Sequence, residues 1–206
     1  MKRFFTRAAL GAMLAFSSAT AFAIDPPDVD LTRAKEIHMA RCFMCHGENG
    51  ESSTPLYPRL AGQHYQYTAK QLEAFLSGKR ESRTMGSMVE GLTVEDMVAL
   101  GVLYEAMPTG ANVVEDQELL AVGRFIYHRG NEFSGVAPCA SCHGVEAHGN
   151  AELPRLASQI ARYTERQLKS FNDRPRTTEN DVMHSIAANM TELEIKAVAA
   201  YVSALD

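Results

Sequence analysis

Apolar residues recur along most of this chain with the three- and four-residue spacing of amphipathic helices. The pattern predicts helices over residues 31–41, 63–77, 93–105, 117–129, 159–172 and 191–204. The third and the last begin with Thr-Val-Glu-Asp and Thr-Glu-Leu-Glu, sequences typical of a helix N-terminal cap. No segment alternates cleanly between apolar and polar residues, so an all-α fold is predicted.

The second predicted helix carries Leu72, Phe75 and Leu76 at helical spacing, and these residues are expected to form one buried stripe. Residues 79–89, which follow it, are predicted to form a loop that carries two methionines. The same loop holds a basic run that is expected to be solvated: Lys79, Arg80 and Arg83.

The order of predicted elements occurs twice, which indicates an internal duplication. At an offset of 96 residues the halves share Pro58/Pro154, Arg59/Arg155, Leu60/Leu156, Ala61/Ala157, Gln63/Gln159, Tyr67/Tyr163, Gln71/Gln167, Phe75/Phe171 and Arg80/Arg176. We therefore expect one small helical domain over residues 24–106, a linker over 107–115 and a second domain over 116–206. Domains this small bury little surface on their own, so a large apolar cofactor would supply much of each core.

Residues 1–23 have the pattern of a cleaved secretory signal peptide: a basic start, a short apolar run and an Ala-Phe-Ala cleavage site. The apolar run is too short to span a bilayer comfortably. Cleavage would leave Ile24 as the first residue of an exported protein, with a periplasmic location expected in a bacterium. An uncleaved anchor is the alternative.

The full chain has a formal net charge of −5, and loss of the three basic residues of the signal would make it −8. An acidic surface disfavours nucleic acid as a partner. It favours a protein partner with a basic docking patch, because opposite charges steer the encounter. Both halves carry the same net charge, so charge alone does not say which half docks.

Two Cys-x-x-Cys-His sequences, Cys42–His46 and Cys139–His143, use every cysteine in the chain. This spacing is typical of covalent c-type haem attachment, in which the two thiols bind the porphyrin edge and the histidine ligates the iron. The thiols are Cys42, Cys45, Cys139 and Cys142, and the ligands are His46 and His143. Zinc, a thioredoxin-type redox pair or a disulfide are alternatives that do not require both histidines.

The second axial position of each iron needs its own ligand, or stays open. Superposing the two capping sequences requires a shift of 98 residues, which carries Met85 onto Met183. The same shift gives Met88 and His184 counterparts that cannot ligate iron. Met85 and Met183 are therefore the predicted ligands, and Met88 and His184 remain the alternatives.

The shared Pro-Arg-Leu sequence after each motif is expected to support the haem. Each proline carbonyl would accept a hydrogen bond from the ligating imidazole, and each leucine would lean on the porphyrin. The arginines are candidates for pairing with haem propionates, with an ordinary exposed arginine as the alternative. These residues are Pro58, Arg59, Leu60, Pro154, Arg155 and Leu156. Four histidines lack a counterpart and are expected to be surface or structural residues: His38, His64, His128 and His148.

The signal peptide, the paired haem motifs, the Pro-Arg-Leu-Ala-x-Gln sequences and the methionines after them resemble the bacterial dihaem cytochrome c4 family. The resemblance implies two class I cytochrome c domains, related by a pseudo-twofold axis, with both haems ligated by histidine and methionine and close to the interface. Two departures stand out: His184 beside the second methionine, and residues 131–138, which have no counterpart in the first half.

The resemblance implies a periplasmic electron carrier, not an enzyme. It would take electrons from a donor such as a quinol-oxidising complex and pass them toward a terminal oxidase. We expect a monomer that binds redox proteins, with peripheral membrane association as a further expectation. The alternatives are a cytochrome subunit of a larger dehydrogenase, such as a flavocytochrome sulfide dehydrogenase, and a dihaem enzyme such as a peroxidase.

Overall fold

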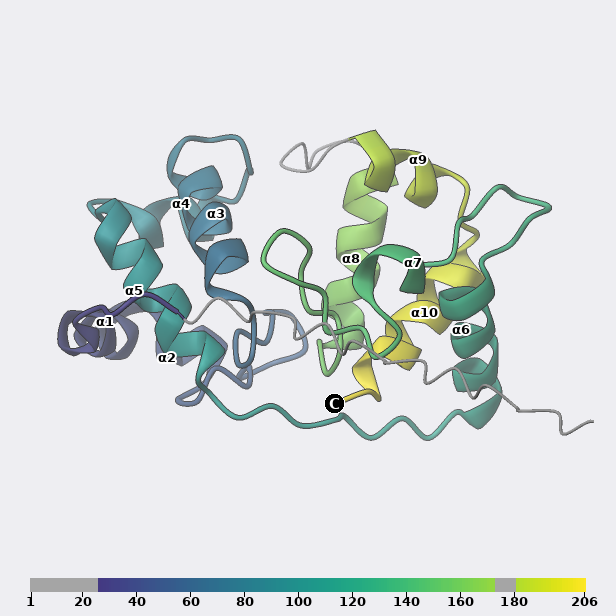
Figure 1. The fold of residues 1–206 in the computed structure, drawn as a ribbon, viewed down its shortest axis with the longest axis horizontal. Helices are drawn as coiled ribbons and strands as arrows, with labels where there is room; N and C mark the ends of the chain where they lie inside the picture. Colours follow the sequence, from purple (N-terminus) through teal and green to yellow (C-terminus); the bar gives the residue numbers. More distant parts are fainter. Residues whose placement is uncertain (1–25, 173–180) are drawn as a thin grey trace, which may run out of the picture.

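The computed structural model describes residues 26–172 and 181–206, and these form a helical protein with two similar halves (Figure 1). The proposed signal peptide and Arg176 lie outside the described residues. Within the described ranges there is no strand, only an isolated bridge between Asn131 and Val136. In the same ranges no helix has the length and apolar character needed to cross a membrane.

The first half consists of five α-helices and one π-helical turn. They are α1 (Leu31–Ile37), η1 (His38–Cys42), α2 (Phe43–His46), α3 (Tyr65–Leu76), α4 (Arg83–Val89) and α5 (Val94–Glu105). The three segments α1, η1 and α2 follow one another without a break, so the first predicted helix runs through the first haem motif. The core of this half lies mainly on α1 and α5 and includes Ala34, Leu100 and Tyr104.

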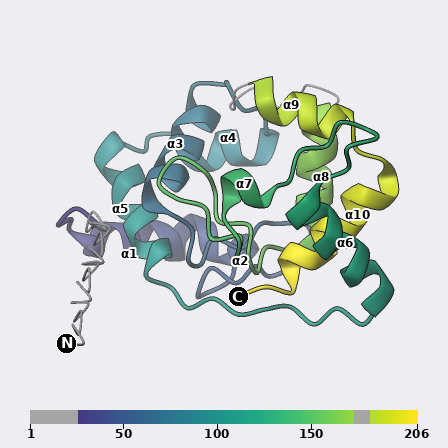
Figure 2. The same cartoon turned by 45° about the vertical axis from the view of Figure 1, so that its right-hand side comes forward.

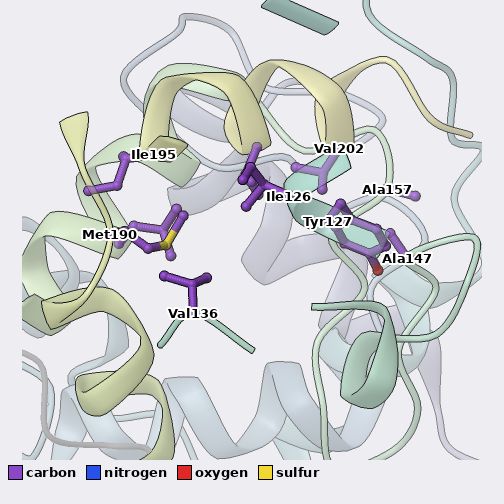
Figure 3. Close-up of a cluster of buried hydrophobic side chains, with 10 residues drawn as sticks. Ile126, Tyr127, Val136, Ala147, Ala157, Met190, Ile195 and Val202 are labelled. Carbon is purple, nitrogen blue, oxygen red and sulfur yellow. The ribbon is translucent and has the colours of Figure 1, made fainter. Parts of the chain in front are cut away.

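The second half repeats this order with one long N-terminal helix. Its helices are α6 (Gln117–Arg129), α7 (Ala140–His143), α8 (Ala161–Asn172), α9 (Asp181–Ala188) and α10 (Glu192–Ser203). Its core gathers Ile126 and Tyr127 of α6 with Ile195, Val198 and Val202 of α10 (Figure 3).

The N-terminal and C-terminal helices of each half cross at a small residue. A Cβ atom on Gly123 of α6 would lie 2.0 Å from the carbonyl oxygen of Ala197 in α10. In the first half the equivalent place belongs to Ala34 of α1, which is 1% exposed. Gly123 lies eight residues further from its haem motif than Ala34 does, and the insertion at 131–138 accounts for the difference.

Both predicted capping boxes are present. Thr93 and Asp96 form one at the start of α5, and Thr191 and Glu194 form the other at the start of α10. Each satisfies two backbone N–H groups that the first helical turn would otherwise leave unpaired.

Two local predictions were wrong. Residues 83–89 form helix α4, capped by the Ser82 side chain, rather than a continuous loop. The predicted stripe of α3 fails at Leu76, which is 46% exposed, whereas Leu72 and Phe75 are partly buried and pack against the first core. The buried residues of α3 are Thr68, Gln71 and Ala74.

The segment between α5 and α6 runs along one edge of the molecule (Figure 1). Asn112 binds it to the second half, since its backbone N–H donates to the Ser203 carbonyl over 2.9 Å and its side chain donates to the Ser158 carbonyl over the same distance. Arg59 of the first half donates to the Gly110 carbonyl over 2.6 Å. Figure 2 shows the two halves side by side above this segment.

Candidate haem sites and the seam between them

Each Cys-x-x-Cys-His sequence folds as a short helical turn. Cys42 ends η1, and Cys45 and His46 lie in α2. Cys139 caps α7, which contains Cys142 and His143. One helical turn brings two thiols and an imidazole to the same side of the chain, as attachment to a porphyrin edge requires. All four cysteines lie in the described part of the chain and none forms a disulfide.

The two motif histidines are buried and held in the same orientation. His46 Nδ1 lies 3.0 Å from the Pro58 carbonyl oxygen, and His143 Nδ1 lies 3.2 Å from that of Pro154. A carbonyl can only accept, so Nδ1 carries the proton in both rings and Nε2 keeps its lone pair. Burial lowers the pKa of His46, which favours the neutral ring that can ligate a metal.

The thiols nearest the cores are shielded from solvent. Burial raises the pKa of the Cys139 thiol to about 11 and also raises that of Cys42. Both thiols are therefore protonated near neutral pH, because burial outweighs the influences that favour a thiolate, namely their N-cap positions and, for Cys42, the adjacent Arg41. The raised pKa contrasts with the lowered pKa of a thioredoxin-type cysteine.

The predicted haem-facing residues gather around each core. Cys42, Leu60 and Met85 all pack against the first core, and Cys139, Leu156 and Met183 pack against the second. In each half, a thiol, a leucine and a methionine from three separate segments therefore pack against the same core. Met85 lies on α4 and Met183 on α9, so both methionines are carried by helices.

The two alternative ligands lie differently. Met88 is 36% exposed at the end of α4. His184 is buried, and its Nδ1 lies 2.7 Å from the Phe171 carbonyl oxygen. That bond joins α9 to the end of α8, which is a structural role that the sequence did not indicate.

Arg59 and Arg155 provide an internal test of whether propionates fit here. The Nε atom of each is buried and has no hydrogen-bond partner among the described residues. Burial also lowers the pKa of both guanidinium groups. Two buried, unsatisfied donors at equivalent positions fit the carboxylates of two haems. The remaining guanidinium nitrogens of Arg59 bind the linker, at Gly110 and Asn112.

Two of the histidines without a counterpart, His38 and His128, lie within hydrogen-bond distance of tyrosine hydroxyls. His38 is 3% exposed and lies 3.0 Å from both the Tyr104 hydroxyl and the Glu48 carbonyl oxygen. His128 lies 2.9 Å from the Tyr201 hydroxyl. Sequence reasoning missed the tyrosines: Tyr104 in the first half and Tyr127 in the second, whose hydroxyl donates to the Gly144 carbonyl.

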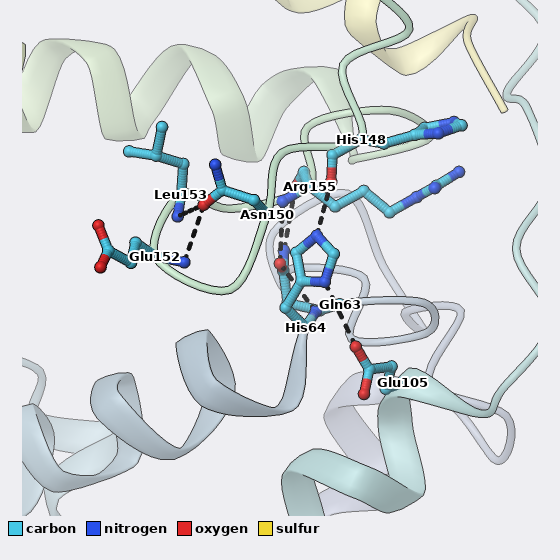
Figure 4. Close-up of polar contacts among 8 residues, drawn as sticks. All are labelled: Gln63, His64, Glu105, His148, Asn150, Glu152, Leu153 and Arg155. Carbon is cyan, nitrogen blue, oxygen red and sulfur yellow. Dashed lines mark hydrogen bonds and ion pairs between the residues drawn. The ribbon is translucent and has the colours of Figure 1, made fainter. Parts of the chain in front are cut away.

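A symmetric set of hydrogen bonds joins the halves directly beside the Arg59 and Arg155 segments. The Gln63 side chain accepts from the Arg155 N–H over 2.9 Å and donates to the Arg155 carbonyl over 3.0 Å. Gln159 makes the reciprocal pair with Arg59, at 2.8 and 2.9 Å. Figure 4 shows the Gln63 side of this arrangement. We call these four residues the glutamine seam.

His64 and His148 extend the contact. His64 Nδ1 lies 3.3 Å from Glu105, and its Nε2 lies 2.8 Å from the His148 carbonyl oxygen in the other half (Figure 4). The sequence offered one signal for the seam: Gln63 and Gln159 are identical at equivalent positions. It did not show that each side chain reaches the opposite half.

Comparison with known proteins agrees with this geometry. The cytochrome c family model matches residues 31–128 and again residues 127–206. Cytochrome c4 of Thiocapsa roseopersicina is 36% identical over 168 residues, covering 80% of this chain and 86% of that protein. The thiosulfate dehydrogenase electron acceptor of Thiomonas intermedia is 33% identical over 216 residues, covering 99% of this chain and 91% of that protein.

The crystal structure of reduced cytochrome c4 from Pseudomonas stutzeri superposes with a TM-score of 0.80 at 28% identity, and covers 87% of this chain and 100% of that one. The two cytochrome c domains, their paired attachment motifs and these relatives indicate two covalently bound haem c groups. The chain belongs to the dihaem cytochrome c4 family of electron-transfer proteins.

Proposed function

We propose that this protein is a periplasmic carrier that moves single electrons between respiratory redox proteins, toward a terminal oxidase. In this proposal His46 and Met85 ligate the first haem iron and His143 and Met183 the second. The proposal also assigns residues 24–106 and 116–206 to separate domains, with 107–115 between them and 1–23 removed on export. Bound haem supplies an iron that changes by one electron, and methionine ligation raises its potential.

The glutamine seam is the observation that carries the proposal. It joins the two Pro-Arg-Leu segments, and the proline carbonyl of each segment binds the histidine of a haem-attachment motif. The two sites are therefore adjacent, and an electron that enters one half has a short route to the other. Two axial ligands on each iron leave no position for a substrate, which favours transfer over catalysis.

The acidic surface supports a partner with a basic docking face. The donor and the acceptor are proposed as redox proteins, a quinol-oxidising complex and a terminal oxidase. Neither requires an additional site on this chain, because the exposed edge of each haem would exchange the electron.

A second candidate role is electron acceptor of a thiosulfate dehydrogenase. The specific support is the Thiomonas intermedia relative with that name, which matches 99% of this chain. The ligands would be the same in both roles, so only the donor differs.

Stopped-flow mixing of the reduced holoprotein with a membrane preparation that contains the terminal oxidase tests the first role. Rapid reoxidation of both haems that cyanide abolishes is expected, because cyanide blocks the oxidase. Mixing the oxidised protein with a purified thiosulfate dehydrogenase and thiosulfate tests the second role. Direct turnover of peroxide by the protein alone would contradict both.

A further inference from the structure

Arg80 lies between the two halves rather than in solvent. Its Nη1 donates to Gln71 Oε1 of α3 over 2.7 Å, and its Nη2 donates to the Tyr163 hydroxyl and to Gln167 Oε1 of α8, both over 2.8 Å. The guanidinium also lies 4.6 Å from the centre of the Phe75 ring. The sequence-based expectation of a solvated basic run therefore fails at Arg80, although Lys79 and Arg83 are exposed.

All of these contacts are made to neutral groups. Two amide oxygens and one hydroxyl accept the hydrogen bonds, and an aromatic face lies against the guanidinium. Within residues 26–172 and 181–206, no carboxylate forms an ion pair with Arg80. Arginine keeps its charge under all ordinary conditions, so a half-buried positive charge lies at this boundary, and its contacts in the described part of the chain are to neutral groups.

The contacts connect that charge to the cores of both halves. Phe75 packs against the first core, together with Cys42 and Met85. Gln167 directly precedes Leu168, a buried member of the second core, which Cys139 and Met183 contact. The two helices that Arg80 joins, α3 and α8, begin just after Gln63 and Gln159 of the glutamine seam. Figure 1 shows them facing each other from the two halves.

We infer that Arg80 is a shared positioning residue, which locks the two halves together and raises the reduction potential of both haems. Reduction adds one negative charge to each haem site, and a nearby cation stabilises that charge more strongly in a partly buried setting than in water. The inference rests on the proposed function, since it concerns the same two irons. Arg80 belongs to neither set of proposed iron ligands, and it acts on the reduction potentials of both haems.

The test is redox titration of the holoprotein with Arg80→Gln, Arg80→Lys and Lys79→Gln. Arg80→Gln removes the charge, and both haems are expected to become harder to reduce. At a fixed ambient potential the ferrous-to-ferric ratio of each should fall about threefold, or roughly 28 mV from the one-electron constant of 59 mV per tenfold change. Arg80→Lys keeps the positive charge but lacks the planar guanidinium group, so both haems should keep most of the reduction potential they have in the unmodified protein.

Lys79→Gln removes the same charge from an exposed neighbour and should leave both potentials unchanged, because solvent screens it. Haem content and circular dichroism of each variant show whether it has folded. If Arg80→Gln folds with two haems and shifts neither potential, or shifts them no more than Lys79→Gln does, the inference is wrong. The proposed function would stand in that case, because it depends on two reducible haems and on electron transfer to redox partners, and not on the effect of Arg80 on either potential.

Discussion

Met85 and Met183 occupy equivalent places on α4 and α9, each packed against the core that also contacts a motif cysteine. If they ligate the irons, Met85→Ala and Met183→Ala should each remove about half of the near-infrared sulfur-to-iron absorption and lower the potential of one haem. Absorption spectra of the oxidised variants measure this directly.

Met88→Leu is the matched control, because Met88 lies on the same helix as Met85 but is partly exposed. It should leave the near-infrared band intact. A band that keeps its full strength in Met85→Ala and loses about half of it in Met88→Leu would reverse the assignment in the first half. In the second half, a band of undiminished strength in Met183→Ala would point to a different ligand.

The negative charge of the Asp96 carboxylate contributes to the stability of the first half. Its carboxylate accepts from Arg33 and from the Thr93 backbone N–H, and the Arg33 bond above all lowers its pKa. Because the folded pKa lies below that of the unfolded chain, Asp96 stabilises the fold above about pH 4, and this contribution is lost as pH falls through the folded pKa.

Asp96→Asn should therefore lower the free energy of unfolding at pH 7 by roughly 1–3 kcal/mol. The difference from the unmodified protein should shrink at pH 3, because the carboxyl of the unfolded chain then binds a proton more readily than the native one, whose pKa is lowered. Denaturant titrations at both pH values measure it, with the exposed Glu95→Gln as control. A difference that is the same at both pH values would rule out the carboxylate charge as the cause.

Single residues were predictable where the repeat constrained them. The hydrogen bonds from His46 to Pro58 and from His143 to Pro154 follow from chemistry and spacing, and the structure contains both. The roles of His184 and Arg80 were not predictable, because a polar side chain in a loop-like sequence has no signal for burial. Their partners come from segments distant in the chain.

At the scale of elements, the close crossing of α6 and α10 depends on Gly123. A Cβ atom added at Gly123 would lie 2.0 Å from a backbone oxygen of α10. A backbone atom cannot move aside as the end of a flexible side chain can. Gly123→Ala should therefore push α6 away from α10 and lower the free energy of unfolding by about 1–3 kcal/mol. Thermal or denaturant unfolding of the purified holoprotein measures the loss.

Gly86→Ala is the contrasting variant, since Gly86 lies in α4 with nothing within 4 Å of the added atom. It should be neutral or stabilising by up to about 1 kcal/mol, because alanine loses less backbone freedom than glycine. Equal destabilisation by the two variants would mean that the α6–α10 crossing is not the cause.

The long helices were predictable because most of them bury an apolar face, and α5 and α10 also begin with capping sequences. Helix α4 was missed because it is only seven residues long and has Gly86 and Ser87 at its centre, although Met85, Met88 and Val89 have helical spacing. Its formation depends on the Ser82 cap and on packing of Val89 and Met85 against the core. Tertiary contacts, rather than local preference, decide such a segment.

At the scale of the whole molecule, the glutamine seam couples the halves. Gln63 and Gln159 are each 8% exposed, and each makes two hydrogen bonds to the opposite half. Replacing both with alanine should weaken the contact by roughly 1–3 kcal/mol per site, because buried backbone groups lose their partners. The single unfolding transition expected of the native protein should then separate into two in calorimetry.

Gln117→Ala is the control, since Gln117 is exposed and bonds only within its own half. A single sharp transition in the double variant would mean that the seam does not couple the halves. The sequence could predict the duplication but not the seam, because glutamine is usually exposed. Only the three-dimensional structure shows that each of the two equivalent glutamine side chains forms its hydrogen bonds with the opposite half.

Redox titration of the purified holoprotein, followed in the visible and near-infrared, tests the central claim most directly. The account predicts two covalently attached haems per chain, each reduced by one electron, with a sulfur-to-iron band as strong as two methionine-ligated haems give. Fewer than two attached haems, or the absence of that band, would contradict it.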